Sequence, residues 1–174
     1  MRKVTFGVAN SLDNYIARKD GAIDWILGDE EAASRMAEFW KTIDTVVIGR
    51  KTYEPVLKSG KPFPTLPGVK NYVLSHTLKE VYDKNVNIIR EDAAEFVRKL
   101  KTEEGKGIAV TGGLLAKTLF EANLIDEVRV NIHPILLGSG IPLFHEMSQQ
   151  IDLELIECKT FKNGCVSVTY GVKG

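Results

Sequence analysis

The chain has 174 residues, of which 44% are hydrophobic, enough for a single domain with its own buried core. Lysine and arginine total 23, as do aspartate and glutamate, so no overall charge attracts nucleic acid or an anionic membrane, and we expect neither partner. The N-terminus enters a strand-like pattern directly and shows no apolar stretch long enough for a signal peptide or a membrane span. This predicts a cytoplasmic protein.

The first predicted strand spans residues 3–9 and is followed by a polar loop over residues 10–24. This loop is long for a connector, and three apolar residues anchor it: Ile16, Ile23 and Trp25. Ordered loops of this length are often lids or binding loops. We therefore expect the loop to take part in a site.

A helix follows, with Asp29 and Glu30 at its start. Met36 and Trp40 recur at helical spacing and are interpreted as core residues, whereas Arg35 falls on the face predicted to meet water. The two acids allow two interpretations. Carboxylates in a first turn favour the helix dipole, with Asp29 as the N-cap. Alternatively, an acid directly after an anchored loop faces a cleft and binds substrate. These residues alone favour the helix-capping interpretation.

The short apolar strand predicted at residues 45–49 ends in Gly49, and the helix after it begins with two cations and a hydroxyl: Arg50, Lys51 and Thr52. Arg50 offers a fork of donors to a phosphate, and Thr52 adds a hydroxyl beside the unpaired N–H groups of the helix start. Alternatively, the two cations are simply solvated.

A second junction of this kind follows the strand at residues 108–110, where Gly112 and Gly113 precede a helix. Two glycines let a ligand approach the backbone closely, and a helix N-terminus suits a phosphate. A pair of glycines also makes a plain tight turn, and this stretch alone leaves both interpretations open. Two such junctions in one small domain make the ligand interpretation more attractive.

The remaining pattern predicts strands at residues 69–74, 86–89 and 128–133, helices at 92–101 and 114–123, and a closing hairpin over 151–172. The order predicts one α/β domain over residues 1–174, with a mostly parallel sheet, flanking helices and an antiparallel edge. Ligands bind such sheets at the carboxyl ends of the strands, where both glycine junctions lie.

The two cysteines, Cys158 and Cys165, are predicted to be free thiols. They lie on the closing hairpin, and a two-residue Asn-Gly turn would place Cys165 opposite Lys162 and Cys158 near Thr169. Neither cysteine has metal-ligand spacing with a histidine, so we expect no metal site.

Taken together, the motifs resemble the dihydrofolate reductase superfamily, in the branch related to the reductase domain of bacterial riboflavin biosynthesis. The matching stretches follow the family's order over nearly the whole chain: residues 11–17, 21–25, 48–54, 73–75, 110–113, 124–128 and 134–144. Asn14 stands where this branch usually has glycine. The resemblance implies a three-layer fold with an eight-stranded sheet, and NADPH lying across the carboxyl edge of that sheet.

The resemblance also implies which residues hold the cofactor and act in catalysis. The adenosine 2′-phosphate side would be held by Gly49, Arg50, Lys51, Thr52, Ser75 and His76. The pyrophosphate would be held by Gly112, Gly113, Leu114 and Leu115, and the nicotinamide would be lined by Ala9, Ile16 and Ala17. Arg50 favours NADPH over NADH, because a bare ribose hydroxyl offers it no charge to pair with. Glu30, five residues after Trp25, takes the position of the acid that assists ring protonation, with Asp29 beside it.

These implications predict an NADPH-dependent oxidoreductase that acts on a CH–NH or sugar-carbonyl group of a pterin, a ribosylaminopyrimidine or a related heterocycle. Two alternatives stay open: a non-catalytic nucleotide-binding or sensor protein, and a structural dimer whose glycine junctions are only turns. The riboflavin-like strand over residues 128–136 suggests a homodimer. No zinc-binding deaminase part precedes the reductase-like part, so we expect no bifunctional riboflavin enzyme.

Overall fold

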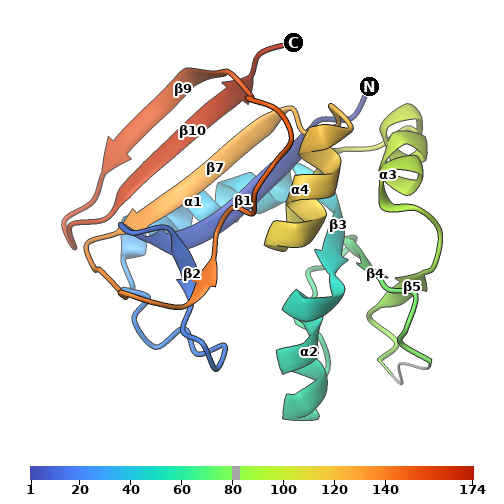
Figure 1. Cartoon of the computed structure of the whole chain (residues 1–174), viewed down its shortest axis with the longest axis horizontal. Coiled ribbons are helices and arrows are strands. Elements are labelled where there is room, and N and C mark those ends of the chain that lie inside the picture. Colours follow the sequence, from blue (N-terminus) through green and yellow to red (C-terminus); the bar gives the residue numbers. More distant parts are fainter. Residues whose placement is uncertain (80–82) are drawn as a thin grey trace.

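The structure is a computed structural model that describes residues 1–79 and 83–174 (Figure 1). Its strands are β1 Val4–Ser11, β2 Tyr15–Ala17, β3 Ile43–Gly49, β4 Lys70–Leu74, β5 Asn87–Ile89, β6 Gly107–Thr111, β7 Glu127–His133, β8 Ile141–Pro142, β9 Leu153–Thr160 and β10 Val166–Val172. Its helices are α1 Glu30–Lys41, α2 Arg50–Ser59, α3 Ala93–Thr102 and α4 Gly113–Glu121. Within the described ranges, none of these helices has the length and apolarity needed to cross a bilayer.

Eight strands form one sheet in the order β5-β4-β3-β6-β1-β7-β10-β9. The first six pair in parallel, and β10 pairs antiparallel with both β7 and β9. The predicted mostly parallel, eight-stranded sheet with an antiparallel C-terminal hairpin is therefore confirmed. Strands β2 and β8 form a separate two-stranded sheet, which the sequence pattern did not predict.

Successive residues of the central strands point to opposite faces of the sheet and pack into two cores. Val47 belongs to the core under α3 and α4. Its neighbour Val46 packs on the other face, where Tyr53 of α2 and both Phe39 and Trp40 of α1 cover the sheet. The predicted three-layer fold with helices on both faces is confirmed, and the structure places two helices on each face.

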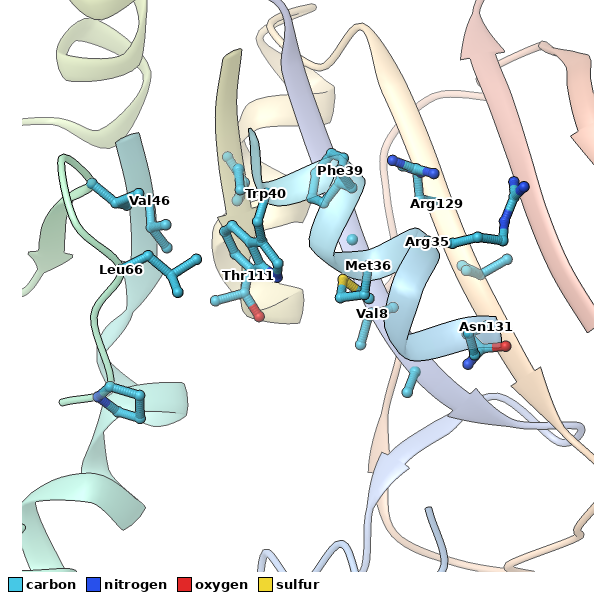
Figure 2. Close-up of a pocket in the computed structure, with 18 of the residues that line it drawn as sticks. Val8, Arg35, Met36, Phe39, Trp40, Val46, Leu66, Thr111, Arg129 and Asn131 are labelled. Atoms are coloured by element: carbon cyan, nitrogen blue, oxygen red, sulfur yellow. The ribbon is translucent and has the colours of Figure 1, made fainter. Parts of the chain in front are cut away.

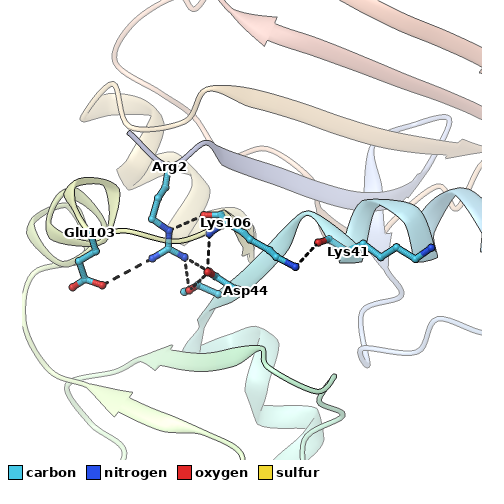
Figure 3. A network of polar contacts seen from close by, with 6 residues as sticks. Arg2, Lys41, Asp44, Glu103 and Lys106 are labelled. Atoms are coloured by element: carbon cyan, nitrogen blue, oxygen red, sulfur yellow. Dashed lines mark hydrogen bonds and ion pairs between the residues drawn. The ribbon is translucent and has the colours of Figure 1, made fainter.

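A buried ion-pair network closes the amino ends of the central strands (Figure 3). Arg2 is only 7% exposed, and its guanidinium donates to the Asp44 carboxylate, to Thr45 Oγ1 at 2.6 Å and to Lys106 O at 2.7 Å. Burial alone would raise the pKa of Asp44. Hydrogen bonds from the Lys106 N–H and Thr45, together with the charge of Arg2, hold that pKa below its ordinary value. This arginine is thus fully partnered.

Helix α1 packs on the sheet more loosely than its pattern predicts. No residue of α1 is buried, and Met36, predicted to be core, is 50% exposed. Arg35, predicted to face water, is half-buried. The reason lies beneath the helix, where β1 presents Gly7 and Ala9. A Cβ atom built on Gly7 would meet nothing within 4 Å. The predicted roles of Met36 and Arg35 are therefore wrong, because a cavity takes the place of a packed core.

The closing hairpin has a longer turn than predicted. Three residues rather than two separate its paired ends, so Cys165 pairs with Phe161 and not with Lys162. The third turn residue is a glycine in the left-handed conformation, which is typical of three-residue hairpin loops. The shifted register pairs Cys158 with Val168, one position from the prediction. Both cysteines are free thiols, as predicted.

Candidate functional site

The two glycine junctions lie side by side at the carboxyl edge of the sheet. Strands β3 and β6 are parallel neighbours in which Ile48 pairs with Thr111, so Gly49 and Gly112, the residues that follow, are adjacent. A Cβ atom on Gly112 would lie 3.5 Å from Gly49 Cα and 2.8 Å from Thr52 Oγ1. The φ angle of Gly112 is 111°, which also favours glycine. No side chain fits at this contact without movement.

Helices α2 and α4, which start at these junctions, begin differently from α1 and α3. Asp29 caps α1 by accepting the Ala32 N–H at 3.0 Å, and Asp92 caps α3 in the same way. Helices α2 and α4 begin instead with glycine, have no side-chain cap and carry no acid in the first turn. Their first N–H groups have no partner within the helix, and no carboxylate offsets the dipole. The paired N-termini therefore suit a phosphate group.

The cations and hydroxyls predicted for the phosphate side lie at the same edge. Arg50 and Lys51 are exposed, and among the residues that the structure describes Arg50 pairs only with Glu54 of its own helix, at 3.2 Å. An exposed pair of this kind contributes little, so Arg50 can turn to a ligand. Ser75, at the end of neighbouring β4, is buried, and its Oγ accepts two N–H groups of the following turn at 3.3 and 3.1 Å. His76 beside it is exposed.

The first turn of α4 offers a ligand its backbone rather than its side chains. Leu114 is 46% exposed, whereas Leu115 is buried in the core under α4, so only the N–H of Leu115 can face a ligand. Gly113 is closed on one side, because a Cβ atom there would lie 3.0 Å from both Leu143 O and His145 Cδ2. The residues predicted to bind the pyrophosphate therefore offer it their backbone N–H groups at the start of α4.

Hydrogen bonds order the loop that follows β1. Asp13 accepts the Ser11 hydroxyl at 2.6 Å and the N–H groups of Leu137 and Gly138 at 3.0 and 2.7 Å. These hydrogen bonds lower the pKa of Asp13, and the bond from the Ser11 hydroxyl has the largest effect. Asn14, which stands where the resembling branch has glycine, has a φ of 64°. Asparagine is among the residues most tolerant of this left-handed conformation.

The three residues predicted to line the nicotinamide are not placed alike. Ile16 packs partly buried against the core, and Ala17 is buried where β2 meets β8. Ala9 lines a cavity of about 550 Å³ between α1 and the sheet. Thr111, the residue before Gly112, lines the same cavity, so the cavity reaches the glycine junctions.

Apolar side chains line most of this cavity (Figure 2). Met36, Phe39 and Trp40 come from α1, while Leu66 belongs to the proline-rich loop before β4. Within residues 1–79 and 83–174, the charged side chains in the lining are those of Arg35, on α1, and Arg129, on β7. The cavity thus combines an apolar body with cationic groups and contains no carboxylate from the described residues.

Neither predicted catalytic acid lines the cavity. Asp29 caps α1, and Glu30 is exposed in the first turn of that helix. The role of Glu30 in proton transfer stays a prediction. In the described part of the chain, no group of three or more histidine, cysteine or acidic side chains is arranged to hold a metal ion.

The polar groups of the cavity, above all Arg129 and Asn131, were not predicted from the sequence. They are two residues apart on β7 and so share one face of the sheet. They pair with Gly7 and Ala9 of β1. The sequence shows which residues of β7 share a face, but it does not show which strand lies beside β7. Only the small residues of the neighbouring strand β1 reveal that this face borders a cavity.

A buried histidine ties the segment between β2 and α1 to the sheet. His133 Nδ1 accepts the Leu27 N–H at 3.2 Å and lies 3.2 Å from Cys165 Sγ. The ring proton is therefore assigned to Nε2. Trp25 packs edge-on against the imidazole with ring centroids 5.4 Å apart, and is a buried anchor as predicted, whereas Ile23 is 57% exposed. Burial lowers the pKa of His133 and raises that of the Cys165 thiol.

The chain is similar to known proteins over nearly its whole length. The model of the RibD C-terminal domain family matches residues 2–167. The Uncharacterized protein YwjB of Bacillus subtilis (strain 168) is 38% identical over 162 residues, which cover 92% of each chain. A Shewanella sp. PV-4 protein assigned to riboflavin biosynthesis superposes over 100% of both chains with a TM-score of 0.86 and 28% identity. A dihydrofolate reductase from Enterococcus faecalis, solved with NADP(H), shares the fold, with a TM-score of 0.71 and 20% identity over 99% of this chain and 97% of that one.

Proposed function

The chain belongs to the RibD C-terminal domain family, and from this membership we propose that it is an NADPH-dependent reductase of a pterin, a ribosylaminopyrimidine or a related small heterocycle. The resemblance inferred from the order of the motifs is confirmed for family and fold. One observation carries the proposal further: two uncapped helix N-termini meet at Gly49 and Gly112, directly beside a cavity of about 550 Å³.

The residues of the paired N-termini fit NADPH. The N–H groups of Gly113, Leu114 and Leu115 would donate to the pyrophosphate, because a helix start favours anionic oxygens. Arg50 would pair with the 2′-phosphate through its planar fork of donors. When bound, the cofactor supplies a hydride. Ala9 belongs both to the predicted nicotinamide wall and to the cavity lining, so hydride donor and acceptor would face each other there.

The cavity fits the acceptor. Its volume lies within the range of about 300–1,000 Å³ that is usual for small-molecule sites. Phe39 and Trp40 of α1 cover it on one side, and the small residues Gly7 and Ala9 leave room for a ring on the other. These residues would hold the ring against the Ala9 wall and exclude water, which favours hydride transfer through orientation. Glu30 remains our candidate for the proton route.

The proposal is tested by titrating the purified protein with NADPH and, in parallel, with NADH, followed by protein fluorescence or thermal shift. We expect tight binding with a clear preference for NADPH. Leu114→Asp places a carboxylate in the first turn of α4, where it favours the helix dipole but repels phosphate. NADPH affinity should fall about 10-fold while the melting temperature holds. Asn123→Asp, at the other end of α4, is the matched control. No binding of either cofactor would reject the proposal.

A second candidate is a nucleotide-binding sensor that keeps the cofactor site without turnover. The lining of the cavity favours it in one respect, because no carboxylate from the described residues is present there to assist protonation. The reductase and the sensor are distinguished by measuring NADPH oxidation in the presence of dihydrofolate or of ribosylaminopyrimidines as substrates. Oxidation with either substrate class supports the reductase, and tight NADPH binding without oxidation of the cofactor by any of them supports the sensor.

A further inference from the structure

We propose that Arg129 and Asn131 form an anion-binding subsite in the cavity, so that the ligand of this protein is a flat ring bearing a carboxylate or phosphate group. The inference deepens the proposed function, on which it rests for the identification of the cavity as the substrate site. It does not depend on the cofactor.

Arg129 carries a charge that the described residues leave unpaired. Its side chain lines the cavity, and its guanidinium carbon lies 4.4 Å from the centroid of the Phe39 ring (Figure 2). It is half-buried, yet it makes no side-chain hydrogen bond or ion pair with any residue in the ranges that the structure describes. A partly desolvated cation without a counterion is unfavourable. Binding an anion would remove that cost.

The other arginines near the sheet have their partners. Arg35, which also lines the cavity, pairs with the Glu157 carboxylate. Arg2, at the opposite edge, binds Asp44 and two further oxygens (Figure 3). Among the described residues, Arg129 therefore differs from Arg35, the other arginine of the lining, in having no carboxylate partner. Its positive charge is available to a ligand in the cavity.

Asn131 and Ser167 add neutral donors beside this charge. Asn131 lies two residues beyond Arg129 on the same face of β7, and its Oδ1 is buried with no hydrogen-bond partner among the described residues. The amide can be placed in either orientation, so its NH₂ group can face an anion. Ser167, on β10, pairs with Asn131 on neighbouring β7 and lines the cavity as well. Three donors from two adjacent strands thus border one end of the cavity.

The remainder of the cavity limits what can carry the anion. On the side of α1 away from Arg129 and Asn131 lie Thr111, Val46 and Leu66 (Figure 2), so this part is mainly apolar. It suits a planar heterocycle, while the guanidinium fork suits the paired oxygens of a carboxylate or a phosphate. The ring would then point toward the glycine junctions and the charged group away from them.

The test uses two pairs of probes that differ in one anionic group, each titrated by calorimetry. Pterin-6-carboxylate is compared with 6-methylpterin, and uridine 5′-monophosphate with uridine. We expect the charged member of at least one pair to bind about 10- to 100-fold more tightly than its neutral partner. Which pair shows the preference distinguishes a carboxylate ligand from a phosphate ligand.

Variants of the protein test whether Arg129 causes the preference for the charged probe. Arg129→Met keeps the apolar contact with Phe39 and should reduce the preference to near one, and Arg129→Lys should retain part of it, because the charge remains without the fork. Arg98→Met, an exposed site on α3, is the control for net charge. Leu114→Asp is the control for anions bound at the helix N-termini. Both controls should keep the preference.

Equal affinities within both pairs, failure of all four probes to bind, or a preference that survives Arg129→Met would each overturn the proposal. NADPH is titrated into the same variants, and Arg129→Met should bind it like the unmodified protein. Absence of NADPH binding would reject the reductase while leaving the probe comparison intact. Normal NADPH binding with no anion preference would reject only the subsite.

Discussion

Gly112 packs against Thr52 so closely that a Cβ atom on Gly112 would lie 2.8 Å from Thr52 Oγ1. The two glycine junctions are therefore one packed unit. We expect Gly112→Ala to lower the free energy of unfolding by about 2 kcal/mol, because both this contact and the positive φ oppose a side chain. NADPH affinity should fall as well. Gly28→Ala, where a Cβ meets nothing within 4 Å, is the control. Equal urea midpoints for the two variants would contradict this prediction, because they would show that the junction accommodates a Cβ atom on Gly112 without loss of stability.

Arg50 should decide which nicotinamide cofactor is preferred. Its only ion-pair partner among the described residues is the exposed Glu54, so it is available to a 2′-phosphate. Arg50→Gln should weaken NADPH binding about 10-fold and leave NADH binding unchanged, as measured by parallel titrations. Arg98→Gln should change neither. An equal loss for both cofactors would mean that Arg50 does not distinguish them.

The two acids at the start of α1 should have different roles, Asp29 a structural one and Glu30 a catalytic one. Asp29→Ala removes the cap on the Ala32 N–H and should cost about 1 kcal/mol of stability in denaturant unfolding. Glu30→Gln should abolish turnover while NADPH binding persists. Turnover that is unaffected by Glu30→Gln would leave Glu30 only a role in the helix dipole.

His133 should make stability depend on pH. Burial lowers its pKa from the ordinary value of 6.5, so below that pH the unfolded chain takes up a proton that the folded imidazole does not. Stability attributable to His133 is therefore present above pH 6.5 and is lost as the pH falls below it. His133→Asn keeps an acceptor for the Leu27 N–H and should flatten the dependence below pH 6.5. The exposed His76→Asn variant should retain it.

The homodimer stays a prediction, and β9 is where we propose that a second copy binds. This strand ends the sheet, and Leu153, Leu155 and Ile156 on it are 39%, 56% and 58% exposed. An edge strand with exposed apolar side chains is suited to pairing with another chain. Leu155→Glu should convert a dimer to a monomer in sedimentation velocity, whereas Leu57→Glu, on α2, should not. A monomer for the unmodified protein would contradict the prediction.

The sequence by itself determined most of the elements, the direction of most strands, and the family. Apolar runs and helical spacings are local patterns, and the glycines Gly49 and Gly112 mark the two strand-to-helix junctions, so these features can be recognised without knowing what lies across the sheet. The hairpin was recognised too. Its register was misjudged by one residue, because the pattern does not distinguish a two-residue turn from a three-residue turn.

Only the tertiary structure decided the character of the candidate site. Met36 and Trp40 have the spacing of core residues, and they line a cavity because Gly7 and Ala9, which are remote in sequence, leave space beneath them. Arg129 has no local signal at all. Whether its charge is paired depends on which side chains from distant parts of the chain lie beside it. Such contacts are set by packing rather than by the pattern of any one segment.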